Sequence, residues 1–110
     1  MLKGVPANPG SFRGPATLGE PPQDSNGTKW ALVLRQSGPE IFIYLDKIGA
    51  IIAEEGGVLC HAAIVAREYG IPCIVGCAGA TTTIKPGDTV ELDATSGTVV
   101  LASEHNGTAP

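Results

Sequence analysis

One segment in the middle of the chain specifies both where a helix begins and where it ends. Residues 56–76 read GGVLCHAAIVAREYGIPCIVG. The small and apolar residues from Ala62 to Ala66 are compatible with a helix. The Gly-Ile-Pro at residues 70–72 predicts its end, because glycine tolerates the left-handed conformation that follows a helix and proline cannot continue one. His61 is therefore expected in the first turn.

The start of a helix is a place where a negatively charged group can bind. The first backbone N–H groups have no partner within the helix, and the positive end of the helix dipole lies there. Gly56 and Gly57 allow the chain to approach a ligand closely. An imidazole nitrogen beside an anion site is suited to attack a phosphorus atom. We therefore interpret His61 as a candidate nucleophile, although a lone histidine in this position is more commonly a surface or capping residue.

The same segment resembles the signature of the phosphohistidine swivelling domain of the phosphoenolpyruvate-utilising enzymes. This family includes pyruvate phosphate dikinase, phosphoenolpyruvate synthase and rifampicin phosphotransferase. Its pattern is Gly-Gly, two residues, Ser or Thr before His, Ala-Ala, two apolar residues, Ala-Arg and Gly-x-Pro, and nearly all of it is present here. Residues 4–14 are similar to the opening of the family's domain, and residues 85–88 and 93–97 to its closing hairpin, so the resemblance covers about residues 3–101.

The resemblance implies an α/β fold, the swivelling β/β/α architecture, in a single compact domain over residues 1–102. A disordered polar tail is expected at 103–110. At 110 residues and 43% hydrophobic content, the chain is long enough for one core.

Local patterns agree with a fold that mixes helices and strands. Buried strands are predicted at 30–34, 50–53 and 73–76, and the order strand, helix, strand around His61 predicts a parallel pair. Alternating polarity predicts a hairpin from strands 89–93 and 98–101. A capping box at residues 37–40 predicts a short helix over 41–46, although the β-branched and aromatic residues at 41–44 would also suit a strand.

By resemblance, the chain is a phosphoryl carrier. His61 would accept a phosphoryl group from a nucleotide or phosphoenolpyruvate, and Gly56, Gly57, Cys60 and Ala62 would bind that group. The two stations, that is, the sites at which His61 would gain and lose the phosphoryl group, would lie on two partner domains. One is a nucleotide-binding domain, and the other is a domain that binds phosphoenolpyruvate, pyruvate or another acceptor, in the same chain or in separate ones. Mg²⁺ is expected on those partner domains. This chain alone is expected to bind no metal or other cofactor.

One position departs from the family's pattern. Cys60 stands where the family usually has a hydroxyl residue, and a thiol is a weaker hydrogen-bond donor. If the hydroxyl helps to hold the phosphoryl group, this chain must depend more on backbone N–H groups.

Charge and composition exclude several other classes of function. The net charge of −4 and the lack of a basic run argue against nucleic acid binding. No apolar run approaches the roughly 20 residues that cross a bilayer, and the N-terminus lacks the apolar core of a signal peptide. Three cysteines suit reduced thiols. We expect a cytoplasmic protein that does not act at a membrane.

Three alternatives remain open from the sequence. Cys60 at a helix start could be a reactive thiolate in a thiol or redox enzyme. Cys60, His61, Cys73 and Cys77 could bind zinc, although they lack a close Cys-x-x-Cys pair and buried cysteines packed as apolar residues are expected instead. The chain could also be an interaction module that keeps the fold without catalysis.

The charged residues near the helix have structural interpretations. Arg67 lies about 120° around the helix from His61. It is therefore expected to form an ion pair with Glu54, Glu55, Glu68 or Asp93 rather than to contact the same phosphoryl group. A carboxylate would repel a phosphoryl group, so Glu54 and Glu55 are interpreted as loop or docking residues.

Overall fold

The computed structural model describes residues 2–19, 21, 27–36, 38, 41–57 and 60–101. Within them the strands are β1 (Leu2–Lys3), β2 (Val5–Asn8), β3 (Ser11–Thr17), β4 (Trp30–Leu34), β5 (Ile48–Ala53), β6 (Cys73–Val75), β7 (Thr89–Asp93) and β8 (Thr98–Leu101). The helices are α1 (Ile41–Tyr44), the 3₁₀ turn η1 (Leu45–Lys47), α2 (His61–Tyr69) and α3 (Ala80–Thr83). The predicted tail at 103–110 and the end of the domain at 102 lie outside the described residues.

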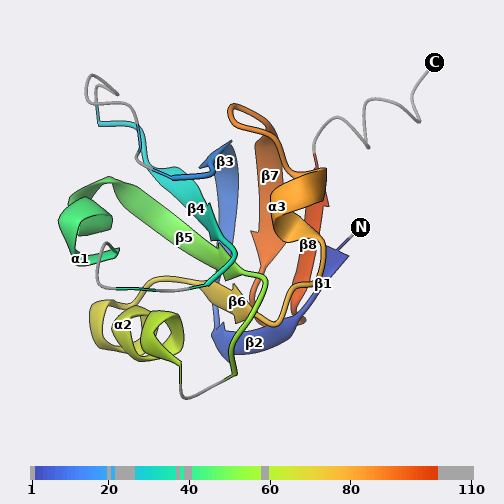
Figure 1. Cartoon of the computed structure of the whole chain (residues 1–110). Coiled ribbons are helices and arrows are strands. Elements are labelled where there is room, and N and C mark those ends of the chain that lie inside the picture. The colour runs from blue at the N-terminus through green and yellow to red at the C-terminus, as the bar shows by residue number, and fades with distance from the viewer. Residues whose placement is uncertain are drawn as a thin grey trace.

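The eight strands form one continuous sheet that folds back on itself, in the order β1-β8-β7-β3-β4-β5-β6-β2 (Figure 1). Strand β3 joins its two halves, because Ser11–Pro15 pair with β7 in antiparallel fashion and Ala16–Thr17 pair with β4 in parallel. Strands β4, β5 and β6 are parallel to one another, and β2 closes that half as an antiparallel edge strand. The predicted parallel pair around α2 is confirmed.

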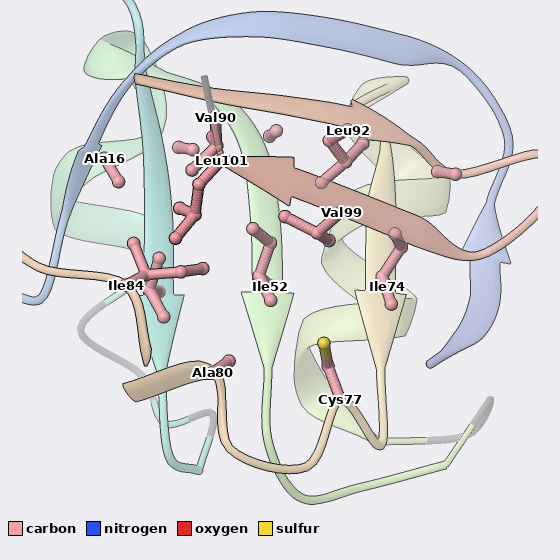
Figure 2. Packing of buried hydrophobic residues seen from close by; sticks show 14 residues of the cluster. Ala16, Ile52, Ile74, Cys77, Ala80, Ile84, Val90, Leu92, Val99 and Leu101 are labelled. Carbon is pink, nitrogen blue, oxygen red and sulfur yellow. The ribbon is translucent and has the colours of Figure 1, made fainter. Parts of the chain in front are cut away.

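Strand β5 shows why the molecule has three layers. Its residues are apolar at nearly every position, as expected for a central strand that is covered on both faces. Ala50 and Ile52 face the first core, between the two halves of the sheet. Ile51 and Ala53 belong to the second core, beneath α1 and α2. Figure 2 shows side chains of β5 and β6 meeting those of β7 and β8 in the first core. The predicted β/β/α architecture is confirmed.

Helix α2 has the bounds that the sequence indicates. Ala62, Ala63, Val65 and Ala66 are buried against the sheet, and three alanines among these four allow a close approach. The helix ends at Gly70, which adopts the left-handed conformation with φ of 69° and donates its N–H to the carbonyl of Ala66. A glycine is favoured at this position because other residues adopt this conformation at a cost.

The other local predictions have mixed outcomes. The helix predicted over 41–46 is confirmed as α1 followed by η1, and the strand alternative is wrong. Most of the capping box at 37–40 lies outside the described residues. The β7–β8 hairpin is confirmed. The sequence did not predict strands β1 to β3 or helix α3. In the part of the chain that the structure describes, no helix is long and apolar enough to cross a membrane.

Candidate functional site

The carboxyl ends of β4, β5 and β6 meet at one edge of the sheet, where parallel sheets commonly bind ligands. The loop Glu54–Gly57 follows β5, and it is hydrogen-bonded to the end of β4 and to the residue that follows it. The amide of Glu54 donates to the carbonyl of Leu34 (2.8 Å), and that of Glu55 donates to the carbonyl of Arg35 (3.0 Å). The diglycine is therefore held beside β4, at the same edge as the start of α2.

The imidazole of His61 has a defined hydrogen-bond partner. Its Nδ1 lies 3.0 Å from the carbonyl oxygen of Gly38. A carbonyl oxygen only accepts hydrogen bonds, so Nδ1 carries the proton and donates it. In the neutral ring the other nitrogen, Nε2, then has the free lone pair. This contact leaves Nε2 as the ring nitrogen that could act as a nucleophile.

An aromatic side chain from α1 packs against the same ring. The ring centroids of Phe42 and His61 are 5.2 Å apart, and the ring planes are tilted by 57°. This separation falls within the range of about 4.5–7 Å that tilted aromatic pairs prefer. His61 is thus contacted by Gly38 and Phe42, both from the segment that connects β4 to β5.

Three of the predicted site residues come together around an open depression of about 300 Å³. It is lined by Gln36, Glu55, Gly56, Cys60 and His61.

The other two predicted site residues have different positions. Gly57 belongs to the same loop but does not line the depression. The side chain of Ala62 is fully buried in the helix–sheet core, so only the backbone of Ala62 could serve the site.

The loop requires a glycine at position 56. Gly56 has φ of +113°, and a Cβ atom there would lie 2.9 Å from Sγ of Cys60. Cys60 occupies the position before the first helical residue, but its side chain makes no capping hydrogen bond. Its backbone amide donates to the carbonyl of Gly57 (3.0 Å). Cys60 therefore packs under the loop and shapes the depression without capping the helix.

Glu54 anchors the other side of the loop to α3. Its Oε2 accepts hydrogen bonds from the amide (2.7 Å) and the hydroxyl (2.5 Å) of Thr81. These bonds, first that from the hydroxyl, lower the pKa of the Glu54 carboxyl, because they favour its charged form. Glu54 is thus a loop residue, as predicted, and the sequence does not predict its partner Thr81.

Glu55 is held by two side chains that follow β4. Its Oε1 accepts a hydrogen bond from Nε2 of Gln36 (2.8 Å), and its Oε2 pairs with Nε of Arg35 (3.2 Å). The bond from Gln36 and then that from Arg35 lower the pKa of the Glu55 carboxyl. The sequence predicts neither contact, because no local pattern links Gln36 or Arg35 to a residue about 20 positions away.

The interpretation of Arg67 as a member of an ion pair is wrong. None of its four proposed partners, all of which are described, pairs with it. Its Nη1 instead donates to the carbonyl oxygen of Ala7 at 3.4 Å. Arg67 therefore ties α2 to β2 through the backbone.

The zinc alternative is also wrong, because the sheet separates its proposed ligands. Cys73 belongs to the core beneath the helices and Cys77 to the core between the sheet halves. Burial raises the pKa of both thiols, that of Cys73 to about 12. Among the described residues, no group of three or more His, Cys, Asp or Glu side chains could hold a metal ion. Cys73 and Cys77 pack as small apolar residues, as expected.

Known proteins share this sequence and fold. The profile of the family described as "PEP-utilising enzyme, mobile domain" matches residues 29–97. A probable phosphoenolpyruvate synthase of Staphylothermus marinus is 38% identical over 103 residues, which cover 90% of this chain and 12% of that protein. The phosphoenolpyruvate synthase of Aeropyrum pernix is 36% identical over 102 residues, with the same coverage of both chains. The chain thus spans about an eighth of the length of these relatives.

Solved structures show the same fold at lower identity. A solution structure of an Enzyme I protein aligns with a TM-score of 0.59 and 24% identity, over 74% of this chain and 36% of that one. The holo-form of Thermococcus kodakaraensis aconitase X aligns with a TM-score of 0.64 and 22% identity, over 91% of this chain and 96% of that one. At these identities the likeness shows the fold alone. The family profile covers well over half of the chain and includes His61 and its loop, and we conclude that the chain belongs to the family of mobile domains of phosphoenolpyruvate-utilising enzymes.

Proposed function

We propose that this chain is a phosphoryl carrier and that Nε2 of His61 is the atom that carries the phosphoryl group. The observation that supports this most directly is the hydrogen bond from Nδ1 to the carbonyl of Gly38. It leaves Nε2 with a lone pair in a neutral ring that faces an open depression at the start of a helix. Membership of the mobile-domain family adds independent support.

The proposed step is an in-line displacement at phosphorus. The lone pair of Nε2 forms the N–P bond while the P–O bond to the leaving group breaks, and the leaving oxygen keeps that electron pair. The ring then carries a positive charge, and its Nδ1–H remains bonded to Gly38. This charge makes the phosphorylated ring a good leaving group for transfer to the second acceptor.

The loop and the first turn of α2 would hold the phosphoryl oxygens. We propose that backbone N–H groups of the loop at Gly56 and Gly57 and of the first turn of α2 serve this purpose, since the thiol of Cys60 is a weak donor and its amide already donates to the carbonyl of Gly57. The helix dipole favours an anion at this end of α2. The bonds that hold Glu55 to Arg35 and Gln36 reduce the repulsion between its carboxylate and the phosphoryl group.

The donor and the acceptor would be supplied by other domains. We propose a nucleotide-binding domain as one station and a domain that binds phosphoenolpyruvate, pyruvate or another acceptor as the second. The described residues offer no group of acidic, histidine or cysteine ligands for a metal, so Mg²⁺ would be held by those domains. The relatives are about eight times as long as this chain, which leaves room for both stations in one polypeptide. Three free thiols suit the cytoplasm as the place of action.

The test is phosphorylation with labelled donors. The chain is mixed with labelled phosphoenolpyruvate and, separately, with β- and γ-labelled ATP, together with partner domains from a related phosphoenolpyruvate synthase. We expect a label that is stable in base and labile in acid, as a phosphoramidate bond should be. It should be absent from His61→Ala and retained by Cys60→Ser.

Other results would contradict the proposal in distinct ways. A label that persists in His61→Ala places the phosphoryl group elsewhere. A label lost in Cys60→Ser and retained in His61→Ala indicates thiol chemistry. No label with any donor and partner, under conditions in which the partner domains phosphorylate their own mobile domain, indicates an interaction module without catalysis.

A further inference from the structure

Phe42 is an exposed apolar side chain that contacts the proposed nucleophile. It is 50% exposed, whereas the preceding residue, Ile41, is fully buried and anchors α1 in the helix–sheet core. Single exposed apolar residues are common and need no explanation by themselves. Phe42 differs because its ring contacts the imidazole of His61. Its neighbour Ile43 is more exposed, at 72%.

One hydrogen bond does not fix the orientation of an imidazole. With only the bond from Nδ1 to Gly38, the ring can still pivot about that contact, and the direction of Nε2 changes as it does. A second contact on the face or edge of the ring removes this freedom, since the side-chain torsions must then satisfy both neighbours at once. Phe42 provides that second contact, at 5.2 Å between ring centroids and a tilt of 57°.

Both contacts come from the same short stretch of chain. Gly38 immediately precedes the segment that leads into α1, and Phe42 lies in the first turn of α1. α1 is held in place by Ile41, which is buried among residues of β4, β5 and α2. Within the described residues, the contacts of the imidazole with Gly38 and Phe42 thus both come from the connection between β4 and β5.

We propose that Phe42 is a positioning residue, which, together with the carbonyl of Gly38, holds His61 in the Nδ1–H tautomer with Nε2 directed outward for attack on phosphorus. The consequence for phosphoryl transfer rests on the proposed function, but the effect on the ring does not. Loss of the Phe42 ring should leave the histidine chemically intact and poorly oriented. Misplacement of a reacting group by about 1 Å can reduce a rate by about a hundredfold, and a ring that keeps its hydrogen bond to Gly38 should lose less.

The experiment has two readouts on the full chain with no partner domain. The first is the ¹⁵N NMR spectrum of the imidazole at alkaline pH, where the ring is neutral and the chemical shifts report which nitrogen carries the proton. The second is the rate of phosphorylation by inorganic phosphoramidate. In that reaction the P–N bond of the donor breaks as the P–Nε2 bond forms, and ammonia leaves after its nitrogen takes up a proton. The variants are Phe42→Ala and Phe42→Leu, with Ile43→Ala as the matched control on the same helix.

We expect both Phe42 variants to shift the tautomer ratio away from Nδ1–H and to slow phosphorylation by about tenfold. Ile43→Ala should change neither readout. Equal behaviour of Phe42→Ala and Ile43→Ala in the NMR spectrum would overturn the proposal, and so would a Phe42→Leu variant with the tautomer ratio of the original chain. If Phe42→Ala does not fold, the tautomer ratios and phosphorylation rates of Phe42→Leu and Ile43→Ala still test the proposal. A changed tautomer ratio in a chain that no donor phosphorylates would refute the proposed function and leave the positioning role intact.

Discussion

The site edge, where β4, β5 and β6 end, and the β7–β8 hairpin use their polar side chains differently. In the hairpin, Asp93 accepts hydrogen bonds from the amides of Thr95 and Ser96, two and three residues further along the chain. At the site edge, Glu54 reaches Thr81, 27 residues away, and His61 reaches Gly38, 23 residues away. The hairpin contacts are local, whereas the site exists only when distant segments have come together.

The size of a surface depression does not by itself identify the candidate site. A depression of about 390 Å³ lies over the hairpin side of the sheet and includes Arg13 and Glu91, which pair with each other. It is larger than the depression beside His61. The smaller one is lined by His61 at the start of α2 and by Gly56, a glycine with positive φ, and the proposed chemistry depends on these features.

The largest effect on the free energy of unfolding should come from truncating a side chain in the core between the two regions. Ile52 of β5 is fully buried in the core between the sheet halves (Figure 2). Ile52→Ala should lower the free energy of unfolding by about 2–5 kcal/mol, because it removes buried methyl groups and leaves a cavity. Urea denaturation measures this change. The exposed Ile43 is the control, since Ile43→Ala should change the stability by less than about 0.5 kcal/mol.

Amide hydrogen exchange of the Ile52→Ala variant would show whether the two regions unfold together. The shared core predicts that amides of β5 and of the β7–β8 hairpin lose protection by similar amounts. Loss of protection in β5 alone would mean that the hairpin half of the sheet unfolds independently of the half that carries the site.

The two glycines of the site loop should respond differently to the same change. Gly56→Ala should destabilise the chain by about 1–3 kcal/mol and slow phosphorylation by phosphoramidate, since φ is +113° and the new Cβ meets Sγ of Cys60. The new Cβ of Gly57→Ala meets no atom of the described residues within 4 Å, so the free energy of unfolding of this variant should change little. Thermal unfolding measures the stability of both variants, and the rate of phosphorylation by phosphoramidate measures their activity. Equal destabilisation by the two variants would show that the loop is not held in this conformation.

The sequence predicts the local parts of this structure well. The β7–β8 hairpin, the bounds of α2 and the buried strands β4 to β6 follow from patterns within a few residues. The long strand β3 was missed because Gly14 and Pro15 interrupt its pattern, and its pairing with both β4 and β7 depends on the fold. Helix α3 is one turn of mostly threonine, a residue without strong helix preference.

The sequence singles out the candidate nucleophile of the proposed site but not the groups that contact it. His61 and Gly56 belong to a contiguous motif, and both line the depression. Gly38, Phe42 and Thr81 act across long separations in the sequence, and no local pattern marks them. For the same reason the sequence does not predict that Arg67 contacts the backbone carbonyl of Ala7 in β2, which lies 60 positions away.

The loss of stability as the pH falls should separate the contributions of Glu54 and Asp93 to the free energy of unfolding. Hydrogen bonds lower the pKa of both carboxyls from ordinary values of 4.5 and 3.8. Each contact therefore stabilises the fold above that ordinary value, and the contribution disappears as the pH falls through the lowered folded pKa. Glu54→Gln and Asp93→Asn should each lose less stability than the original chain between about pH 6 and about pH 3.

Urea denaturation at several pH values measures these slopes. Thr81→Val is the matched control for Glu54, because it removes the hydroxyl donor and keeps the carboxylate, and should bring the pKa of Glu54 nearer to its ordinary value. An unchanged slope in both Glu54→Gln and Thr81→Val would show that the Glu54–Thr81 contact does not form in solution.

The smallest effects should come from two exposed ion pairs, one in each region. Arg13 pairs with Glu91 at 2.9 Å on the hairpin side, and Arg35 pairs with Glu55 at 3.2 Å beside His61. Arg13→Ala and Arg35→Ala should each change the free energy of unfolding by less than about 1 kcal/mol, as solvent screens such pairs. Only Arg35→Ala should slow phosphorylation by phosphoramidate, by up to about fivefold, because the Glu55 carboxylate loses a cation and repels the incoming phosphoryl group. Adding Glu55→Gln to Arg35→Ala should restore the rate, and failure to do so would mean that Arg35 acts on the donor directly.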